Sequence, residues 1–353
     1  MARKPASRYL LFALATVFLS MSGTFGLLLG LDVYLHQRFE RSAGLNIRGY
    51  RGAVVPKRKQ PGEQRVVVLG GSTALGYGVP LEQSFPAFLE RKLNDRRQPR
   101  GRRLIRVVNL AYNSEGAYAY LINLRSYDYL DYDLALFYTG YNDLEQPNIY
   151  VYRQTSPIFR LTGYMPIIPL VFKEKAMAIR YGGDLEGAYR RRKTVFKPNL
   201  AGQATASALE AAVTISQSLE HQLGRLTKKP PEEEAPASVD CREPWRQYCQ
   251  SVYVAADHVL HRGKKTIIVT QPYCSDKHVE QQRVLVGMLK ARFSDYPRFR
   301  HVNLGKVVDL HDPTLSYDKL HLTAEGNERI AEHLVQPVLD MLESDRNTRP
   351  QRP

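Results

Sequence analysis

Five short apolar segments, separated by stretches with helical spacing, constrain the fold of this chain most strongly. Their sequences are QRVVVLG (64–70), RLIRVVNLA (103–111), YDLALFYTG (132–140), KTIIVTQ (265–271) and RFRHVNLG (298–305). Short apolar strands that alternate with helices are typical of right-handed β-α-β units, whose parallel sheet is covered on both faces. We therefore predict an α/β fold: a three-layer, flavodoxin-like domain with a five-stranded parallel sheet. Ligands bind such a domain beyond the carboxyl ends of the strands.

The alternation is interrupted between the third and fourth segments. Residues 144–236 hold an apolar stretch broken by three prolines, then a helical stretch, then a loop rich in proline and charge. The prolines disfavour a second membrane helix. The apolar stretch could instead be a flap over the site, a segment in the membrane interface or an ordinary buried insertion. We expect one domain over 64–343 with this insertion, followed by a basic tail at 344–353.

An uncharged apolar segment lies near the N-terminus, at 9–31. At about 1.5 Å per residue, a helix of that length crosses a hydrocarbon core of about 30 Å. Basic residues precede it, so the positive-inside rule places 1–8 in the cytoplasm and the following domain in the periplasm or outside the cell. A cleaved signal peptide is the alternative, but the run is long for one and no A-x-A-like site closes it. We expect an uncleaved signal anchor, with a polar, basic linker at 43–63.

The chain is basic, with 50 Lys and Arg against 35 Asp and Glu and a formal net charge of +15. The basic runs lack interleaved aromatic residues and any nucleic-acid-binding motif, so we predict solvated surface and no nucleic-acid partner. A basic surface is also compatible with anionic lipid. Nothing in the sequence predicts an oligomeric state.

Only three cysteines occur: Cys241, Cys249 and Cys274. Three thiols exclude a disulfide-dense scaffold and a four-thiolate zinc site. In an extracytoplasmic domain, Cys241 and Cys249 could close a short disulfide loop and leave Cys274 free. We treat this pairing as a hypothesis.

A glycine-rich turn, GGSTALGYG (70–78), follows the first apolar segment and places Ser72 just past its carboxyl end. It is not a phosphate loop of the G-x-x-x-x-G-K-[ST] type, because no lysine follows, and it does not match the dinucleotide motif G-x-G-x-x-G. Ala74 stands where a G-x-S-x-G nucleophile elbow needs its second glycine. By itself the turn is compatible with a plain chain reversal or with the mount of a nucleophile.

Two later motifs favour the nucleophile. In DKLHLTAEGN, Asp318 precedes His321 by three residues, immediately before a helix. This spacing lets the carboxylate orient the imidazole, which can then take a proton from a serine hydroxyl. In YTGYND, Asn142 follows the third apolar segment, where its amide could donate to a developing oxyanion.

Four separated stretches, LGGSTALGYG, VVNLAYNSEG, YTGYND and DKLHLTAEGN, resemble in order the four blocks of SGNH (GDSL-type) hydrolases. The resemblance covers roughly 65–342 apart from the insertion. It implies that Ser72 is the nucleophile, that His321 is the general base and acid, and that Asp318 orients the imidazole. It also implies an oxyanion hole formed by the backbone N–H of Ser72, the side chain of Asn142 and a backbone N–H of the second block.

Two positions depart from the family pattern. Gly71 replaces the aspartate of the G-D-S form, which is not a triad member. In the second block, the family's oxyanion glycine has no clean counterpart: direct counting from Asn109 reaches Ser114, whereas Gly116 lies two residues further on. The third oxyanion donor is therefore expected at Ser114 or Gly116.

The predicted function is that of a membrane-anchored serine esterase that cleaves an ester of a cell-envelope glycan or a lipid through an acyl-serine intermediate. No metal and no organic cofactor is expected. Two alternatives stay open: an O-acyltransferase that passes the acyl group to a polysaccharide with the same triad, and a non-catalytic binding protein of the same fold.

Overall fold

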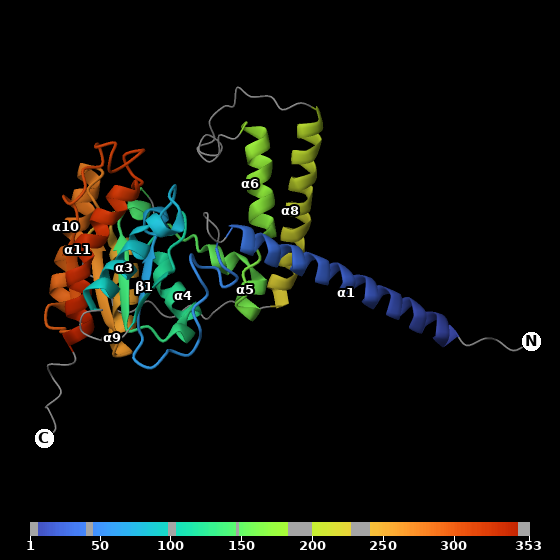
Figure 1. The fold of residues 1–353 in the computed structure, drawn as a ribbon, viewed down its shortest axis with the longest axis horizontal. Helices are drawn as coiled ribbons and strands as arrows, with labels where there is room; N and C mark the ends of the chain where they lie inside the picture. Colours follow the sequence, from blue (N-terminus) through green and yellow to red (C-terminus); the bar gives the residue numbers. More distant parts are fainter. Residues whose placement is uncertain are drawn as a thin grey trace, which may run out of the picture. The chain divides into compact units, whose positions relative to one another are not determined.

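The computed structural model describes residues 6–39, 45–97, 104–145, 148–182, 200–226 and 241–344 (Figure 1). The chain divides into two compact units, a smaller one drawn from 1–39 and 166–226 and a larger one drawn from 40–165 and 227–353. The insertion expected at 144–236 is thus divided between the two units. Its first part, up to Met165, belongs to the larger unit.

Five parallel strands form the sheet of the larger unit, which confirms the predicted fold class. The sheet order is β2-β1-β3-β4-β5, and each neighbouring pair is parallel. This order is that of the flavodoxin-like doubly wound fold. All residues of β3 and β4 are buried, as expected for strands covered on both faces. The strands are β1 Gln64–Gly70, β2 Ile105–Asn109, β3 Leu134–Thr139, β4 Lys265–Thr270 and β5 Phe299–Asn303.

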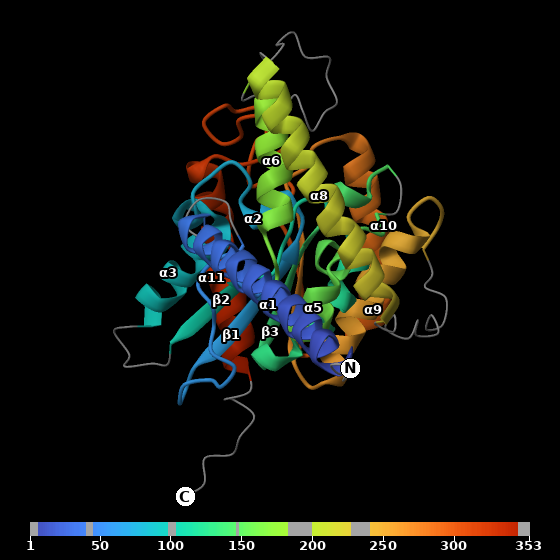
Figure 2. The same cartoon turned by 90° about the vertical axis from the view of Figure 1, so that its right-hand side faces the viewer.

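Helices cover both faces of this sheet. Figure 2 shows α3 and α11 on one side of the strands and α9 and α10 on the other. Side chains of α4 join the same core as those of α9 and α10. The bounds are α3 Phe85–Arg97, α4 Tyr118–Ser126, α9 Arg246–His261, α10 Asp276–Phe293 and α11 Ala324–Glu343.

The side chains of β1 alternate between the two cores. Val66 and Val68 pack in the core that includes residues of α3 and α11. Val67 and Leu69 pack in the core that includes residues of α4, α9 and α10. Successive side chains of a strand point to opposite faces, so an unbroken apolar run can supply both cores.

Side chains of α3 satisfy backbone groups on the outer edge of β2. Asn94 Oδ1 accepts a hydrogen bond from Ile105 N at 2.9 Å, and Glu90 Oε2 accepts one from Val107 N at 2.6 Å. Unpaired strand edges are templates for association with another chain. These two side chains cover that edge.

The segment expected as a linker, 43–63, packs on the larger unit from residue 45 on. Tyr50 and Arg51 are buried, and Arg51 N donates to Asn109 O at 3.2 Å in an isolated antiparallel bridge. Its described residues are therefore part of the domain. The aromatic and apolar side chains among the basic residues provide the buried surface that holds it there.

The described residues of the smaller unit include three helices. They are α1 Ala6–Phe39, α6 Ile168–Arg180 and α8 Leu200–Leu226. Figures 1 and 2 show α6 side by side with part of the longer α8. The proline at position 169 lies in the first turn of α6, where its missing N–H leaves no hydrogen bond unmade.

Among the described residues, α1 is the one helix long and apolar enough to cross a membrane, over Leu11–Arg38. It continues beyond the expected 9–31 and includes the buried Asp32. Asp32 Oδ1 accepts hydrogen bonds from the amides of Ile167 at 2.9 Å and Ile168 at 2.8 Å. This carboxylate therefore caps the start of α6.

A disulfide joins Cys241 and Cys249, whose Cα atoms lie 6.4 Å apart. Cys274 is a free thiol. This is the pairing hypothesised from the sequence.

Candidate active site

Ser72 lies just past the carboxyl end of β1, at the first residue of the four-residue helix α2 (Ser72–Leu75). A Cβ atom on Gly70 would lie 2.6 Å from Ala74 Cβ, so the tight turn from strand to helix requires glycine there. Gly76, at a φ of +84°, ends α2 and donates its N–H to Ser72 O. The two glycines thus confine Ser72 to a short, fixed segment at the edge of the sheet.

A chain of hydrogen bonds joins Ser72, His321 and Asp318. His321 Nε2 lies 2.8 Å from Ser72 Oγ, and His321 Nδ1 lies 2.7 Å from Asp318 Oδ2. The side chains of His321 and Asp318 are 15% and 16% exposed, so solvent still reaches the site. With the Nδ1 proton donated to Asp318, Nε2 is free to accept the proton of the serine hydroxyl.

A tight turn fixes Asp318 and His321. Asp318 Oδ1 accepts hydrogen bonds from Leu320 N at 3.0 Å and His321 N at 2.6 Å, while Lys319 adopts a φ of +65°. Burial raises the pKa of Asp318, but the hydrogen bonds from the side chain and backbone of His321 and the charge of its ring outweigh it, so the pKa is lowered overall. The carboxylate is therefore held in its ionised form beside the imidazole.

Two tyrosines pack near the imidazole of His321. The ring centroids of Tyr77 and Tyr317 lie 5.0 Å and 5.9 Å from that of His321. Tyr317 donates its hydroxyl to Tyr77 O at 3.0 Å, and its side chain is 46% exposed. These aromatic rings provide a surface beside Ser72 that a bound molecule can contact.

Asn142 lies in a single 3-10 turn, η4 (Tyr141–Asp143), directly after β3. Its Nδ2 donates to Glu115 O at 2.8 Å. A Cβ atom on Gly71 would lie only 1.8 Å from that nitrogen, so the amide sits over the backbone that precedes Ser72. An amide nitrogen carries two N–H bonds, which leaves one for a second acceptor.

Ser114 and Gly116 both lie in the loop between β2 and α4. Ser114 has a φ of 60°, and its carbonyl accepts from the side chain of Asn148. A Cβ atom on Gly116 would lie 2.5 Å from Asp143 Oδ1. Gly116 is thus packed against the residue that follows Asn142, and both residues stay candidates for the third donor.

The carboxyl group of Asp143 is buried at the start of α4. Both of its oxygens accept from Ala117 N, at 3.0 Å and 3.3 Å. Burial raises the pKa of Asp143 to about 7, with the hydrogen bond from Ala117 acting in the opposite direction. The carboxyl group of Asp143, the residue that directly follows Asn142, therefore changes its charge near neutral pH.

Arg51 and Asn109 hold the chain that follows Ser72. Arg51 Nη1 donates to Gly76 O at 2.7 Å, and Asn109 Nδ2 donates to Ala74 O at 3.1 Å. Asn109 belongs to the second sequence block, but no spacing in the sequence pointed to Arg51. The motifs also gave no role to Tyr77, which lies inside the glycine-rich turn, or to Tyr317, which directly precedes Asp318.

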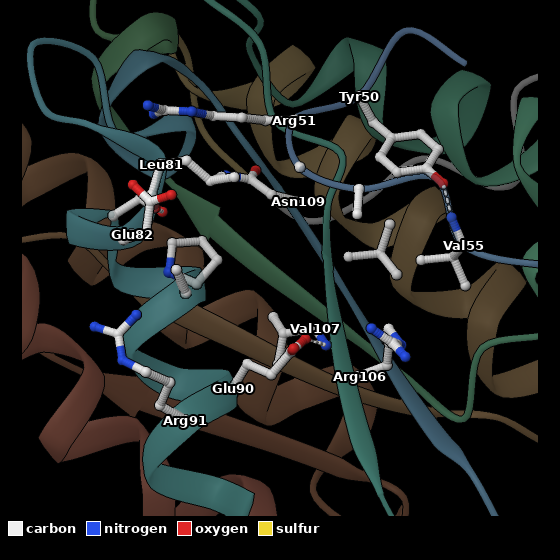
Figure 3. Close-up of a pocket in the computed structure, with 16 residues that line it drawn as sticks. Tyr50, Arg51, Val55, Leu81, Glu82, Glu90, Arg91, Arg106, Val107 and Asn109 are labelled. Carbon is white, nitrogen blue, oxygen red and sulfur yellow. Dashed lines mark hydrogen bonds between the residues drawn. The ribbon is translucent and has the colours of Figure 1, made fainter. Parts of the chain in front are cut away.

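A pocket of about 250 Å³ lies beside the outer edge of β2, and Figure 3 shows the residues that line it. Arginines 51, 91 and 106 and glutamates 82 and 90 line it, together with apolar side chains. None of the three residues of the hydrogen-bonded chain lines this pocket. Its mixed charges do not select a ligand of one sign, and its Arg51 already binds the carbonyls of the segment after Ser72.

Within the described parts of the chain, no group of three or more His, Cys, Asp or Glu side chains could hold a metal ion. At the carboxyl edge of the sheet, the structure brings together the hydrogen-bonded side chains of Ser72, His321 and Asp318.

No protein-family model matches the sequence, and no curated protein matches it. Among solved structures, a G-D-S-L family protein from Desulfitobacterium hafniense DCB-2 is similar at 12% identity and a TM-score of 0.41, covering 77% of this chain and 98% of its own. The esterase EstA from a Pseudoalteromonas species is similar at 9% identity and a TM-score of 0.44, covering 79% and 99%. A family 3 carbohydrate esterase from Clostridium thermocellum is similar at 11% identity and a TM-score of 0.40, covering 80% and 98%. Structural similarity at these low identities and TM-scores assigns neither an activity nor a substrate to this chain.

Proposed function

We propose that this chain is a serine ester hydrolase of the SGNH type, with Ser72 as nucleophile, His321 as general base and acid, and Asp318 as the group that orients the imidazole. The observation that carries the proposal is the continuous hydrogen-bonded chain Ser72–His321–Asp318, at 2.8 Å and 2.7 Å, beyond the carboxyl end of the sheet. Residues 249 positions apart meet there with the geometry that nucleophilic catalysis needs.

The reaction starts when Ser72 Oγ attacks the ester carbonyl carbon while His321 Nε2 takes the hydroxyl proton. The tetrahedral intermediate then collapses, the bond to the alcohol oxygen breaks, and His321 returns the proton to that oxygen. A water molecule, deprotonated by His321, attacks the acyl-serine carbonyl in the second half. The carboxylic acid leaves, and the proton on His321 returns to Ser72 Oγ.

The developing negative charge needs preorganised donors. The N–H of Ser72, the Nδ2 of Asn142 and a backbone N–H from Ser114 or Gly116 fill this role in the proposal. Such donors contribute on the order of 100- to 1,000-fold each to turnover. Asp318 stabilises the imidazolium that forms in each half-reaction.

The proposal includes a membrane anchor. The exposed apolar helix α1 supports it, as do the basic residues before that helix and the Cys241–Cys249 disulfide, which is typical of oxidising compartments. The catalytic domain then faces the periplasm or the cell exterior, where its substrate is an ester of a glycan or a lipid. Digestion of the domain by protease added to intact spheroplasts would support this topology, whereas full protection would contradict it.

Hydrolysis of p-nitrophenyl acetate by the full-length protein in detergent tests the activity. Ser72→Ala should abolish release of p-nitrophenol, whereas Ser294→Ala, at an exposed site past α10, should leave it unchanged. Equal rates for wild type and Ser72→Ala would contradict the proposal. With an oligosaccharide added, acetylated sugar among the products would indicate acyl transfer in place of hydrolysis.

A further inference from the structure

We propose that the buried ion pair between Glu115 and Arg153 is a positioning pair that holds the Asn142 amide in the oxyanion hole. The inference deepens the proposed ester hydrolysis and depends on it. It assigns a role to Arg153, which comes from the segment after β3 that the sequence marked only as an insertion. Neither residue touches the reacting atoms.

Arg153 is completely buried, and each of its three guanidinium nitrogens donates a hydrogen bond. It lies in η5 (Tyr152–Thr155), and its side chain has no exposed surface. Its Nε donates to Gly49 O and its Nη2 to Leu110 O, both at 2.7 Å. Its Nη1 lies 3.2 Å and 3.4 Å from the two carboxylate oxygens of Glu115. The guanidinium thus fixes the Glu115 carboxylate relative to Leu110, the residue that follows the carboxyl end of β2.

The Glu115 carboxylate is held on its other sides as well. Asn123 Nδ2 donates to Oε2 at 2.7 Å, and Tyr152 N donates to Oε1 at 3.0 Å. The side chain is 1% exposed. Burial raises the pKa of Glu115, and the charge of Arg153 and these hydrogen bonds oppose that effect. Removing one partner of such a pair leaves an uncompensated buried charge, so the loop has to rearrange.

The backbone of Glu115 connects this pair to the oxyanion hole. Glu115 O is the acceptor for Asn142 Nδ2 at 2.8 Å, and a Cβ on Gly71 would lie 3.1 Å from the same carbonyl oxygen. One residue therefore carries the ion pair on its side chain and the Asn142 acceptor on its main chain. A shift of Glu115 moves the acceptor that sets the direction of the Asn142 amide.

A double-mutant cycle separates positioning from general stability. Glu115→Gln keeps the shape but removes the charge, and it should lower kcat roughly 10- to 100-fold with a small change in KM, because misplacement by about 1 Å costs about that much. In an Asn142→Ala background its target is already gone, so Glu115→Gln should cost less than about threefold. Arg153→Lys, which keeps the charge but loses the fork of donors, should show the same pattern.

The Glu63–Arg65 pair offers a matched control. It is also buried, at 2% and 0% exposure, with Oε1 and Nε 2.7 Å apart, but it lies at the start of β1, at the opposite end of that strand from Ser72. Glu63→Gln should lower the melting temperature and leave kcat within about twofold. A loss of kcat in Glu63→Gln equal to that in Glu115→Gln would overturn the positioning role.

A structural readout keeps the inference testable apart from the activity. In a crystal structure of Glu115→Gln, Asn142 Nδ2 should leave its acceptor on residue 115, whereas in Glu63→Gln it should stay. An unmoved Asn142, or equal kcat losses from Glu115→Gln with and without Asn142, would overturn the proposal. Absence of Ser72-dependent hydrolysis in the wild type would instead contradict the esterase function, and the crystal structures would still decide whether the pair holds Asn142.

Discussion

The backbone of Gly71 packs directly against the side-chain amide of Asn142. A Cβ atom on Gly71 would lie 1.8 Å from Asn142 Nδ2. Gly71 has a φ of −91° and a ψ of −153°, in the extended region, so space, and not backbone conformation, requires glycine. The aspartate that the resembling family carries at this position would displace the amide proposed to stabilise the oxyanion.

Gly71→Ala should therefore disable turnover while preserving the fold. The added methyl group pushes the end of the Asn142 side chain away, and kcat should fall on the order of 100-fold, as for loss of one oxyanion donor. Gly287→Ala is the matched control, because a Cβ there meets nothing within 4 Å. It lies inside α10, where alanine should raise stability by roughly 0.5–1 kcal/mol. Normal kcat in Gly71→Ala would refute the steric argument.

Asn142→Ala should lower kcat about 100- to 1,000-fold with an unchanged circular dichroism spectrum. The loss arises because the donor acts only on the charge that develops in the transition state, so KM should change little. Steady-state kinetics on p-nitrophenyl acetate measures both constants. A rise in KM at constant kcat would place Asn142 in substrate binding instead.

Asp318→Asn should lower kcat on the order of 10⁴-fold, because an amide no longer stabilises the imidazolium or selects the required tautomer of His321. Asp312→Asn provides a comparison in the same loop. Asp312 also accepts from a backbone N–H two residues on, that of Thr314, yet it does not contact His321. If both variants lost activity equally, the effect would come from the loop and not from the triad.

Asp143→Asn should change the pH dependence of stability. Because the folded pKa of Asp143 is raised to about 7, above the unfolded value of about 4, the folded state binds the proton more tightly. Ionised Asp143 thus costs stability above pH 7, and that cost disappears as pH falls from about 7 to 4. Asparagine removes this cost, which is on the order of 4 kcal/mol at most, because each pKa unit corresponds to about 1.4 kcal/mol. Melting temperatures should favour the variant more at pH 8 than at pH 4.5; an equal gap at both would disprove the raised pKa.

The sheet was predictable because each strand is a short apolar run that both layers of helices bury. The predicted 64–70 coincides with β1, and the other four runs contain their strands. The motifs predicted Ser72 and Asn142 after strand ends and Asp318 and His321 directly before a helix, and hydrogen bonds join Ser72, His321 and Asp318 in the structure.

The supporting contacts were not predictable from the sequence. Arg153 reaches Glu115 across 38 positions, and Arg51 reaches the segment after Ser72 across 24 or more. Such polar contacts follow no periodicity, because they depend on where loops pass over the sheet. The 43–63 segment was interpreted as a linker for its charge and proline, although the aromatic Tyr50 anchors it.

The most direct test of the account is labelling with a fluorophosphonate, which reacts with an activated serine. Intact-mass analysis of the folded full-length protein should show one adduct, and peptide mapping should locate it on Ser72. Ser72→Ala should take up no label. Absence of an adduct in the folded wild type, or an adduct that persists in Ser72→Ala, would contradict the assignment of Ser72 as the nucleophile.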